Sequence, residues 1–320
     1  MRSSFLILLV FLLNCTQKPN EEIKNQKPPI IVFSHNLHGE LEICGCRKKP
    51  LGGMVQAAGL FENLKSQHPN QEILYFDTGD SLYPTGQIPE VFLKSHHFAA
   101  SHVMSFFKDL KITAFLPGDQ DLTFGYQNLI DRMGKSRVPI LLSNTLEQDK
   151  HIQKYLIHEM SHMVIYFVGV LEKNLLTSDD SLLIESETAI KEQVKEINKI
   201  HGERFPAKQK MMILLSHSGM RRDKELATKF PEFSWIIGAH SQSFTQLPEI
   251  VGKTQIVQVL SRNHHMGVID LSKIKNSFKT IELNDLFSEY DGNTTWKKRY
   301  EKYQTELKSI KESELDSIGN

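Results

Sequence analysis

The chain alternates short apolar runs with longer amphipathic segments, and this alternation restricts its fold more than any other feature. The runs are rich in β-branched and aromatic residues and predict strands at 30–33, 73–76, 113–116, 140–142, 163–170, 212–215, 235–237, 255–260 and 268–271. The amphipathic segments predict helices at 53–65, 89–109, 126–133, 185–200 and 222–229. Strands separated by helices are typical of an α/β fold. The later runs lie closer together, so we expect a second sheet that is mixed or antiparallel.

The first residues have the pattern of a targeting segment rather than of a folded element. Arg2 precedes an apolar run at 5–13, which is too short to span a bilayer as a helix. The block LLNC at the end of this run resembles a bacterial lipoprotein signal, which implies a lipid on Cys15 and a membrane-anchored protein of the cell envelope, with 1–15 as the signal. An ordinary signal peptide, with Cys15 removed, and an uncleaved anchor are the alternatives. Residues 16–29 are polar and contain three prolines, so they predict a tether.

Composition limits the classes of partner and the number of domains. The 320 residues can bury a sizeable core, in one large domain or two small ones. Lys and Arg total 38, as do Asp and Glu, so no net field attracts nucleic acid and no nucleic-acid partner is expected. We assign 30–285 to the main domain and 286–320 to a helical tail. At helical spacing, one stripe of this tail collects Trp296, Tyr300, Tyr303 and Leu307.

Polar blocks follow five of the predicted strands: SHNLHG, DTGDSL, PGDQD, SHSG and GAHSQ. In an open α/β sheet, groups just beyond the carboxyl ends of neighbouring strands converge on one crevice. Aspartate and histidine supply the oxygen and nitrogen donors that suit zinc, manganese and iron. The blocks therefore predict one site, assembled from Asn36, His38, Asp80, Asp119, His217, His240 and Gln242.

In order and content these blocks resemble the calcineurin-like metallophosphatases, and within them the periplasmic 5′-nucleotidase group. The family's blocks are TND-x-HG, GD, GNHE-F-D-x-G, a strand ending in SH, and GHSH. Here the corresponding blocks are SHNLHG, TGDSL, GDQDLTFG, LLSHSG and GAHSQ. The resemblance covers about residues 30–283. It implies a four-layer αββα metallophosphatase sandwich with the metal site at the strand ends.

The resemblance implies that one metal half-site is kept. The family's ligands for this metal correspond to Asp80, Asp119, His217 and His240. At position 119 the family has an asparagine, so Asp119 adds an anionic oxygen donor. This half-site predicts one divalent ion of the Mn, Zn or Fe class. The alternative is that the four residues are polar turn residues without a ligand.

The second half-site and the catalytic group depart from the family. The ligands of the second metal correspond to Asn36, His38, Asp80 and Gln242. Two of these four donors are neutral amides, which bind such metals weakly, so we expect a weak or empty second site. The family's catalytic histidine and the aspartate that orients it correspond to Gln120 and Thr123. Neither is an acid near neutral pH, although Gln120 can donate a hydrogen bond.

The first block continues into ICGCRKKPLGG, which resembles a subgroup of nucleotidase-like proteins with a CGC and PLGG block. Three uses of Cys44 and Cys46 stay open. They could chelate a soft metal with His35 or His38 as a third donor, form an easily reduced redox disulfide, or form a structural disulfide.

These features lead us to expect an envelope protein that hydrolyses a small phosphoester, or a related ester, at a degenerate metal-dependent site. The nucleotidases stack the base on a further C-terminal domain, and this chain ends soon after the resemblance does, so nucleotides are not the expected substrate. The rival functions are a thiol redox or metal-carrying protein that uses Cys44 and Cys46, and a noncatalytic binding module of the envelope.

Overall fold

The structure is a computed structural model that describes residues 27–43, 49–176, 181–289 and 293–318. Its helices are α1 (Met54–Gln67), α2 (Leu93–Asp109), α3 (Tyr126–Ser136), α4 (Ser186–Arg204), α5 (Met220–Lys229) and α6 (Asn293–Asp316). Its strands are β1 (Ile30–Ser34), β2 (Ile73–Asp77), β3 (Ala114–Phe115), β4 (Ile140–Leu141), β5 (Ile152–Gln153), β6 (Tyr155–Glu159), β7 (Met163–Leu171), β8 (Gln209–His217), β9 (Trp235–Gly238), β10 (Glu249–Val251), β11 (Thr254–Val257), β12 (His265–Asp270) and β13 (Phe278–Glu282). Each predicted helix therefore has a counterpart in the structure.

The strands form two mixed sheets. The first has the order β13-β12-β1-β2-β3-β4-β5, in which β1 to β5 are parallel and β12 and β13 are antiparallel. The second has the order β10-β11-β9-β8-β7-β6, with antiparallel strands at its two edges. The second sheet is mixed, as expected. The predicted run at 268–271 belongs instead to the first sheet, because β12 pairs with β1, with Ile31 opposite Ile269.

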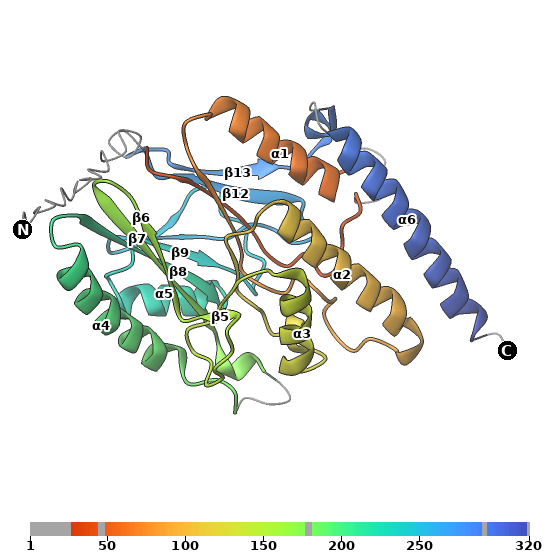
Figure 1. The fold of residues 1–320 in the computed structure, drawn as a ribbon, viewed down its shortest axis with the longest axis horizontal. Helices are drawn as coiled ribbons and strands as arrows, with labels where there is room; N and C mark the ends of the chain where they lie inside the picture. The colour runs from red at the N-terminus through yellow and green to blue at the C-terminus, as the bar shows by residue number, and fades with distance from the viewer. Residues whose placement is uncertain (1–26, 44–48, 177–180, 290–292, 319–320) are drawn as a thin grey trace, which may run out of the picture.

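Strand β7 shows how the two sheets stack. Ile165 and Phe167 contribute to the core shared with the first sheet, whereas Val164 and Tyr166 contribute to the core beneath α4 and α5. The rings of Phe167 and Phe76, in β2, lie 4.5 Å apart and join the two sheets. Figure 1 shows α1, α2 and α6 on one side of the paired sheets and α4 and α5 on the other. The chain is thus a four-layer αββα sandwich, which confirms the predicted fold class.

Helix α6 lies against α1 and α2 (Figure 1) and uses the predicted stripe. Tyr303 and Leu307 are buried, and Trp296 and Tyr300 are partly buried against the same core. Trp296 meets the ring of Phe106, in α2, edge-on at 5.7 Å. Within the ranges that the structure describes, no helix has both the length and the apolar composition needed to cross a membrane.

Candidate metal centre

The five polar blocks come together at the carboxyl ends of β1, β2, β3, β8 and β9. Four side chains meet most closely, and each offers one ligand atom within 4.8 Å of the others: Asp80, Asp119, His217 and His240. We call these four residues the retained half-site. His217 and Asp80 are buried, whereas the side chain of His240 keeps 35% of its surface exposed. The centre is therefore open to solvent on the side of His240.

The loops that carry the site adopt an unusual backbone. Positive φ angles occur at Asn36 (51°), His38 (56°), Asp80 (57°), His240 (70°) and Gln242 (49°). A left-handed conformation costs a non-glycine residue of order 1 kcal/mol or more and persists only where the surrounding structure imposes it. Five such positions at one site indicate that the surrounding fold holds these side chains in place.

Glycine at position 118 allows the loops to approach one another. A Cβ there would lie 2.3 Å from Asp80 Oδ1 and 2.5 Å from Cε1 of His217. A side chain at Gly79, which has a φ of 99°, would collide with the backbone of Gly118. The two glycines that precede Asp80 and Asp119 are therefore required for both carboxylates to reach His217.

The contacts of the His217 ring show whether these residues fit a metal ion. Its Nδ1 lies 2.6 Å from the carbonyl oxygen of Thr78, which can only accept, so Nδ1 carries the proton. In the neutral ring Nε2 then holds a lone pair, although it lies 3.3 Å from Asp80 Oδ2 and 3.1 Å from Asp119 Oδ1. A buried lone pair that faces two anions requires a cation, either a metal ion or a second proton. The two nitrogen and two oxygen donors fit Zn, Mn or Fe.

The titration of the metal-free site follows from the same contacts. Burial lowers the pKa of His217, but Asp80 and Asp119 outweigh burial and raise this pKa well above its usual value. Burial raises the pKa of Asp119, but hydrogen bonds with His217 and His240 outweigh it and hold this pKa well below its usual value. The metal-free site therefore holds a proton at the place where a divalent cation would bind.

Gln120, at the position of the family's catalytic histidine, orients both carboxylates. Its side-chain Nε2 donates to Asp119 Oδ2 at 2.6 Å, and its backbone N–H donates to Asp80 Oδ1 at 2.9 Å. These bonds leave Asp119 Oδ1 and Asp80 Oδ2 facing His217. Thr123 is exposed and its hydroxyl donates to the carbonyl of Gln120 at 2.6 Å. The Gln120 amide is therefore a positioning group rather than a proton donor to a substrate.

On its other side, Asp80 contacts the side-chain amide of Asn36, and the hydrogen bonds around this amide fix its orientation. The backbone N–H of Val259 donates to Nε2 of His35 at 2.9 Å, so the proton of this ring is on Nδ1. That proton is donated to Asn36 Oδ1 at 2.7 Å, which turns Nδ2 of Asn36 toward Asp80 Oδ2 at 3.1 Å. Burial lowers the pKa of His35 to about 4, so the ring is neutral near pH 7. Asn36 therefore offers Asp80 a donor, not a metal ligand.

Gln242 makes a similar contact with His38. Its Nε2 can only donate, and it lies 3.3 Å from Nε2 of His38. The nitrogen that His38 would offer to a second metal is thus engaged by an amide. We call Asn36, His38 and Gln242 the altered half-site.

Several residues that hold the loops of the site in place are not predicted from the sequence. Asp121 accepts four backbone N–H bonds, from Gly118, Asp80, Ser81 and Leu82, and so fixes the loop after β2. Asp223 accepts from Gln258 Nε2 at 2.9 Å, and the other amide atom of Gln258 accepts from Ser241, next to His240. Asp121 could have been found from its place in the GDQD block, but Asp223 and Gln258 lie in segments without a motif.

The predictions for the three cysteines concern residues that the structure does not describe. Cys15, Cys44 and Cys46 lie outside the described residues. Both ring nitrogens of His35 are engaged by Asn36 and Val259, so His35 is not available as a third donor to the thiols.

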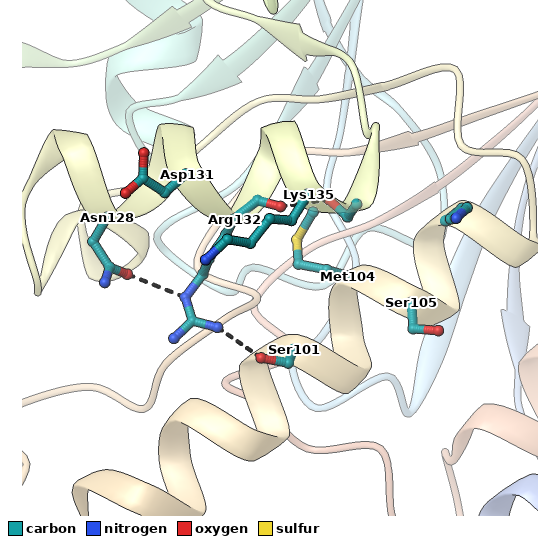
Figure 2. Close-up of a pocket in the computed structure, with 9 residues that line it drawn as sticks. Ser101, Met104, Ser105, Asn128, Asp131, Arg132 and Lys135 are labelled. Carbon is teal, nitrogen blue, oxygen red and sulfur yellow. Dashed lines mark hydrogen bonds between the residues drawn. The ribbon is translucent and has the colours of Figure 1, made fainter.

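A cavity of about 580 Å³ lies away from this centre, between α2 and α3. Figure 2 shows Arg132 in it, with Nε donating to Asn128 at 3.1 Å and Nη1 donating to Ser101 at 2.8 Å. Nη2 lies 2.7 Å from Nδ1 of His97. Because its guanidinium is engaged by these side chains, Arg132 joins the two helices rather than presenting a free cation to a ligand.

Comparisons with known proteins bear on the fold. No protein-family model matches the chain. An apyrase from Anopheles gambiae is 21% identical over 269 residues, which are 74% of this chain and 45% of the apyrase. A human 5′-nucleotidase is 22% identical over 67% of this chain and 38% of its own length. The chain thus spans less than half the length of these two curated relatives.

Two solved structures share the fold. The calcineurin-like phosphoesterase YfkN from Bacillus subtilis superposes with a TM-score of 0.65 and 17% identity, over 88% of this chain and 98% of that one. The sulfate thiohydrolase SoxB from Thermus thermophilus gives a TM-score of 0.66 and 17% identity, over 92% of this chain and 61% of that one. The chain has the calcineurin-like metallophosphatase fold, of the 5′-nucleotidase type.

Proposed function

We propose that the protein is a divalent-metal-dependent hydrolase that acts on a small phosphoester, or on a related ester, at a single-metal centre. One observation carries the proposal. The retained half-site brings one possible ligand atom from each of its four side chains within 4.8 Å of the others, and the two remaining carboxylate oxygens accept hydrogen bonds from Gln120. Proteins similar in sequence or fold are named 5′-nucleotidase, apyrase and sulfate thiohydrolase, which supports esters of phosphate and sulfur acids as the substrate class.

The roles of the side chains follow from their contacts. Asp80 Oδ2, Asp119 Oδ1, His217 Nε2 and His240 Nδ1 would hold the ion. A bound ion of the Zn, Mn or Fe class would supply Lewis acidity and an activated water. Gln120 positions the carboxylates and has no proton to give to a leaving group. Esters with good leaving groups, such as aryl esters, are therefore the substrates that this site can hydrolyse fastest.

The N-terminal pattern supports a location for this activity. We propose that Cys15 carries a lipid, that 16–29 tether the enzyme, and that it acts in the cell envelope on a small molecule. In cells, Cys15→Ser should move the protein from the membrane fraction to the soluble fraction. Unchanged fractionation of the Cys15→Ser protein would exclude lipid on this cysteine as the anchor.

Metal analysis combined with hydrolysis assays tests the activity. The purified protein should hold one equivalent of a divalent ion and hydrolyse aryl phosphates in preference to alkyl phosphates. Asp80→Ala should remove both properties, whereas Asp131→Ala, which changes a carboxylate of the distant α2–α3 cavity, should change neither. Hydrolysis that persists in Asp80→Ala protein, or purified protein that takes up no divalent ion, would exclude the proposal. One bound ion without hydrolysis of any phosphate or sulfur ester would identify a binding module instead.

A further inference from the structure

A second cavity, of about 360 Å³, opens beside the altered half-site. His38 and residues that follow it form one wall, Ala99 of α2 forms another, and Tyr303 and Leu307 of α6 form a third. Its volume lies within the range of about 300–1,000 Å³ found for small-molecule sites. The cavity is therefore large enough to hold part of a small ligand.

The cavity adjoins the metal centre through two residues. His38 lines it and also contacts Gln242, at 3.3 Å between the two Nε2 atoms. Arg262 lines it and donates its backbone N–H to the carbonyl of Asn36 at 2.8 Å. Asn36 in turn contacts Asp80 at 3.1 Å. A ligand bound at the retained half-site thus has this cavity beside it.

The wall formed by α6 is held in place by contacts at both ends of the helix. Glu314 is buried, and its Oε1 accepts from the backbone N–H of Ser95, in α2, at 2.9 Å. At the other end, Arg299 pairs with Asp109 at 2.5 Å. Tyr303 and Leu307 are only 2% and 5% exposed. The apolar wall is therefore formed before any ligand binds, so binding requires little ordering of side chains.

The charges that line the cavity balance. Arg262 and Lys311 are cationic, and Glu40 and Glu42 are anionic. Arg262 lies 3.6 Å from Glu40, which partly neutralises it. Burial lowers the pKa of His96, so this residue is neutral near pH 7. With no net charge and an apolar wall, the cavity does not suit a second phosphate or another strongly charged group.

We propose that this cavity binds the uncharged, apolar body of the ester whose acidic group lies at the retained half-site. Leu307 and Tyr303 would then select substrates by the size of that body. The inference rests on the proposed function for the position of the acidic group, but it concerns binding, not hydrolysis. It predicts esters with a medium-sized apolar body, such as aryl esters, as substrates rather than nucleoside polyphosphates.

Alkylphosphonates test the cavity without hydrolysis, because their carbon–phosphorus bond is not an ester. We would measure the binding of methyl-, butyl- and hexylphosphonate to the Mn-loaded full chain by calorimetry. Burying a methylene changes an affinity by up to about fourfold, so hexylphosphonate should bind at least about tenfold tighter than methylphosphonate. Leu307→Ala and Ile43→Ala, which each shorten a lining side chain, should lower this preference by about threefold or more and leave methylphosphonate binding unchanged.

A matched control lies on the same helix. Leu315 is 56% exposed and does not line the cavity, so Leu315→Ala should keep the full preference for hexylphosphonate. Ile43→Ala removes less buried surface than Leu307→Ala and keeps the test valid if the latter protein does not fold.

The outcomes separate this inference from the proposed function. Metal-dependent binding that does not vary with chain length would overturn the inference alone, as would a preference that neither lining variant changes. Length-dependent binding that the variants weaken, in a protein that hydrolyses no ester, would support the cavity and exclude the hydrolase. Absence of binding by every phosphonate would overturn the inference, whereas the hydrolase would still be decided by the metal analysis and the hydrolysis assays.

Discussion

The retained and altered half-sites share one carboxylate and differ in what faces it. On the retained side, Nε2 of His217 lies 3.3 Å from Asp80 Oδ2, and Asp119 adds a second anion. On the altered side, the Asn36 amide donates to the same oxygen at 3.1 Å. The first arrangement requires a cation, whereas the second is complete without one.

The difference shows how an amide can satisfy one side of a shared carboxylate while the other side requires a cation. A neutral amide supplies a hydrogen atom to Asp80 where a cation would otherwise lie, so the shared carboxylate is not left unpaired. Because His35 and Val259 fix the orientation of Asn36, this amide cannot turn its oxygen toward the centre without losing its hydrogen bonds with His35 and Asp80. This network therefore opposes metal binding at the altered half-site, in line with the prediction of a weak or empty second site.

The largest effect is expected from a change at the retained half-site. His217→Ala should lower metal affinity by at least about a hundredfold, because loss of a ligand exceeds the tenfold to hundredfold effect of losing a ligand's hydrogen-bond partner. In a chelator the metal-free variant should also unfold more easily, by about 3–5 kcal/mol, because Asp80 and Asp119 lose their cation. Metal competition assays and urea unfolding would measure both. The exposed His162→Ala should match the wild type, and an unchanged affinity in His217→Ala would remove this residue from the ligand set.

A double change should convert the altered half-site into a second metal site. Asn36→Asp with Gln242→His restores the two family donors, so the variant should bind two equivalents of Mn where the wild type binds one. In a chelator it should be about 3 kcal/mol or more less stable than the wild type, because the new carboxylate lies beside Asp80 without a cation. Metal analysis and thermal unfolding with and without Mn would measure these effects. Gln242→His alone should keep one ion, and a double variant that also keeps one would contradict the assignment.

The sequence predicts the fold and the meeting of the polar blocks at the strand ends, but not the contacts between them. Helix positions and the convergence of seven side chains follow from periodicity and from polar blocks at strand ends. The orientation of Asn36 does not, because it depends on the N–H of Val259, which is 224 positions from His35. Strand β10 (Glu249–Val251) is not predicted, because it is short and exposed and shows no alternation of apolar and polar residues. The sheet to which β12 belongs follows only from its pairing with β1, which the sequence does not show.

The hydrogen bonds that join Val259, His35 and Asn36 should make the stability of the folded protein fall in acid. The pKa of His35 is about 4 in the folded state and near 6.5 in the unfolded chain, so below about pH 6.5 the unfolded state binds the extra proton. The contribution of His35 is complete above that pH and is lost as the pH falls, by about 3 kcal/mol near pH 4. His35→Gln does not titrate, so its stability relative to the wild type should rise as the pH falls. Urea unfolding in a chelator would measure this difference, and a constant difference between pH 4 and pH 7 would contradict the lowered pKa of His35 in the folded state.

The smallest effect is expected from a change at Gln120, which donates hydrogen bonds to both Asp80 and Asp119. Gln120→Ala removes the donor to Asp119 Oδ2 but leaves the backbone N–H that holds Asp80. Metal affinity should therefore fall by about tenfold, the lower end of the effect of losing a ligand's partner, with one ion still bound. Gln127→Ala, which removes an exposed amide from α3, is the matched control and should change nothing. A loss as large as that of His217→Ala would make Gln120 itself a ligand, whereas no loss would mean that His217 and His240 alone orient Asp119.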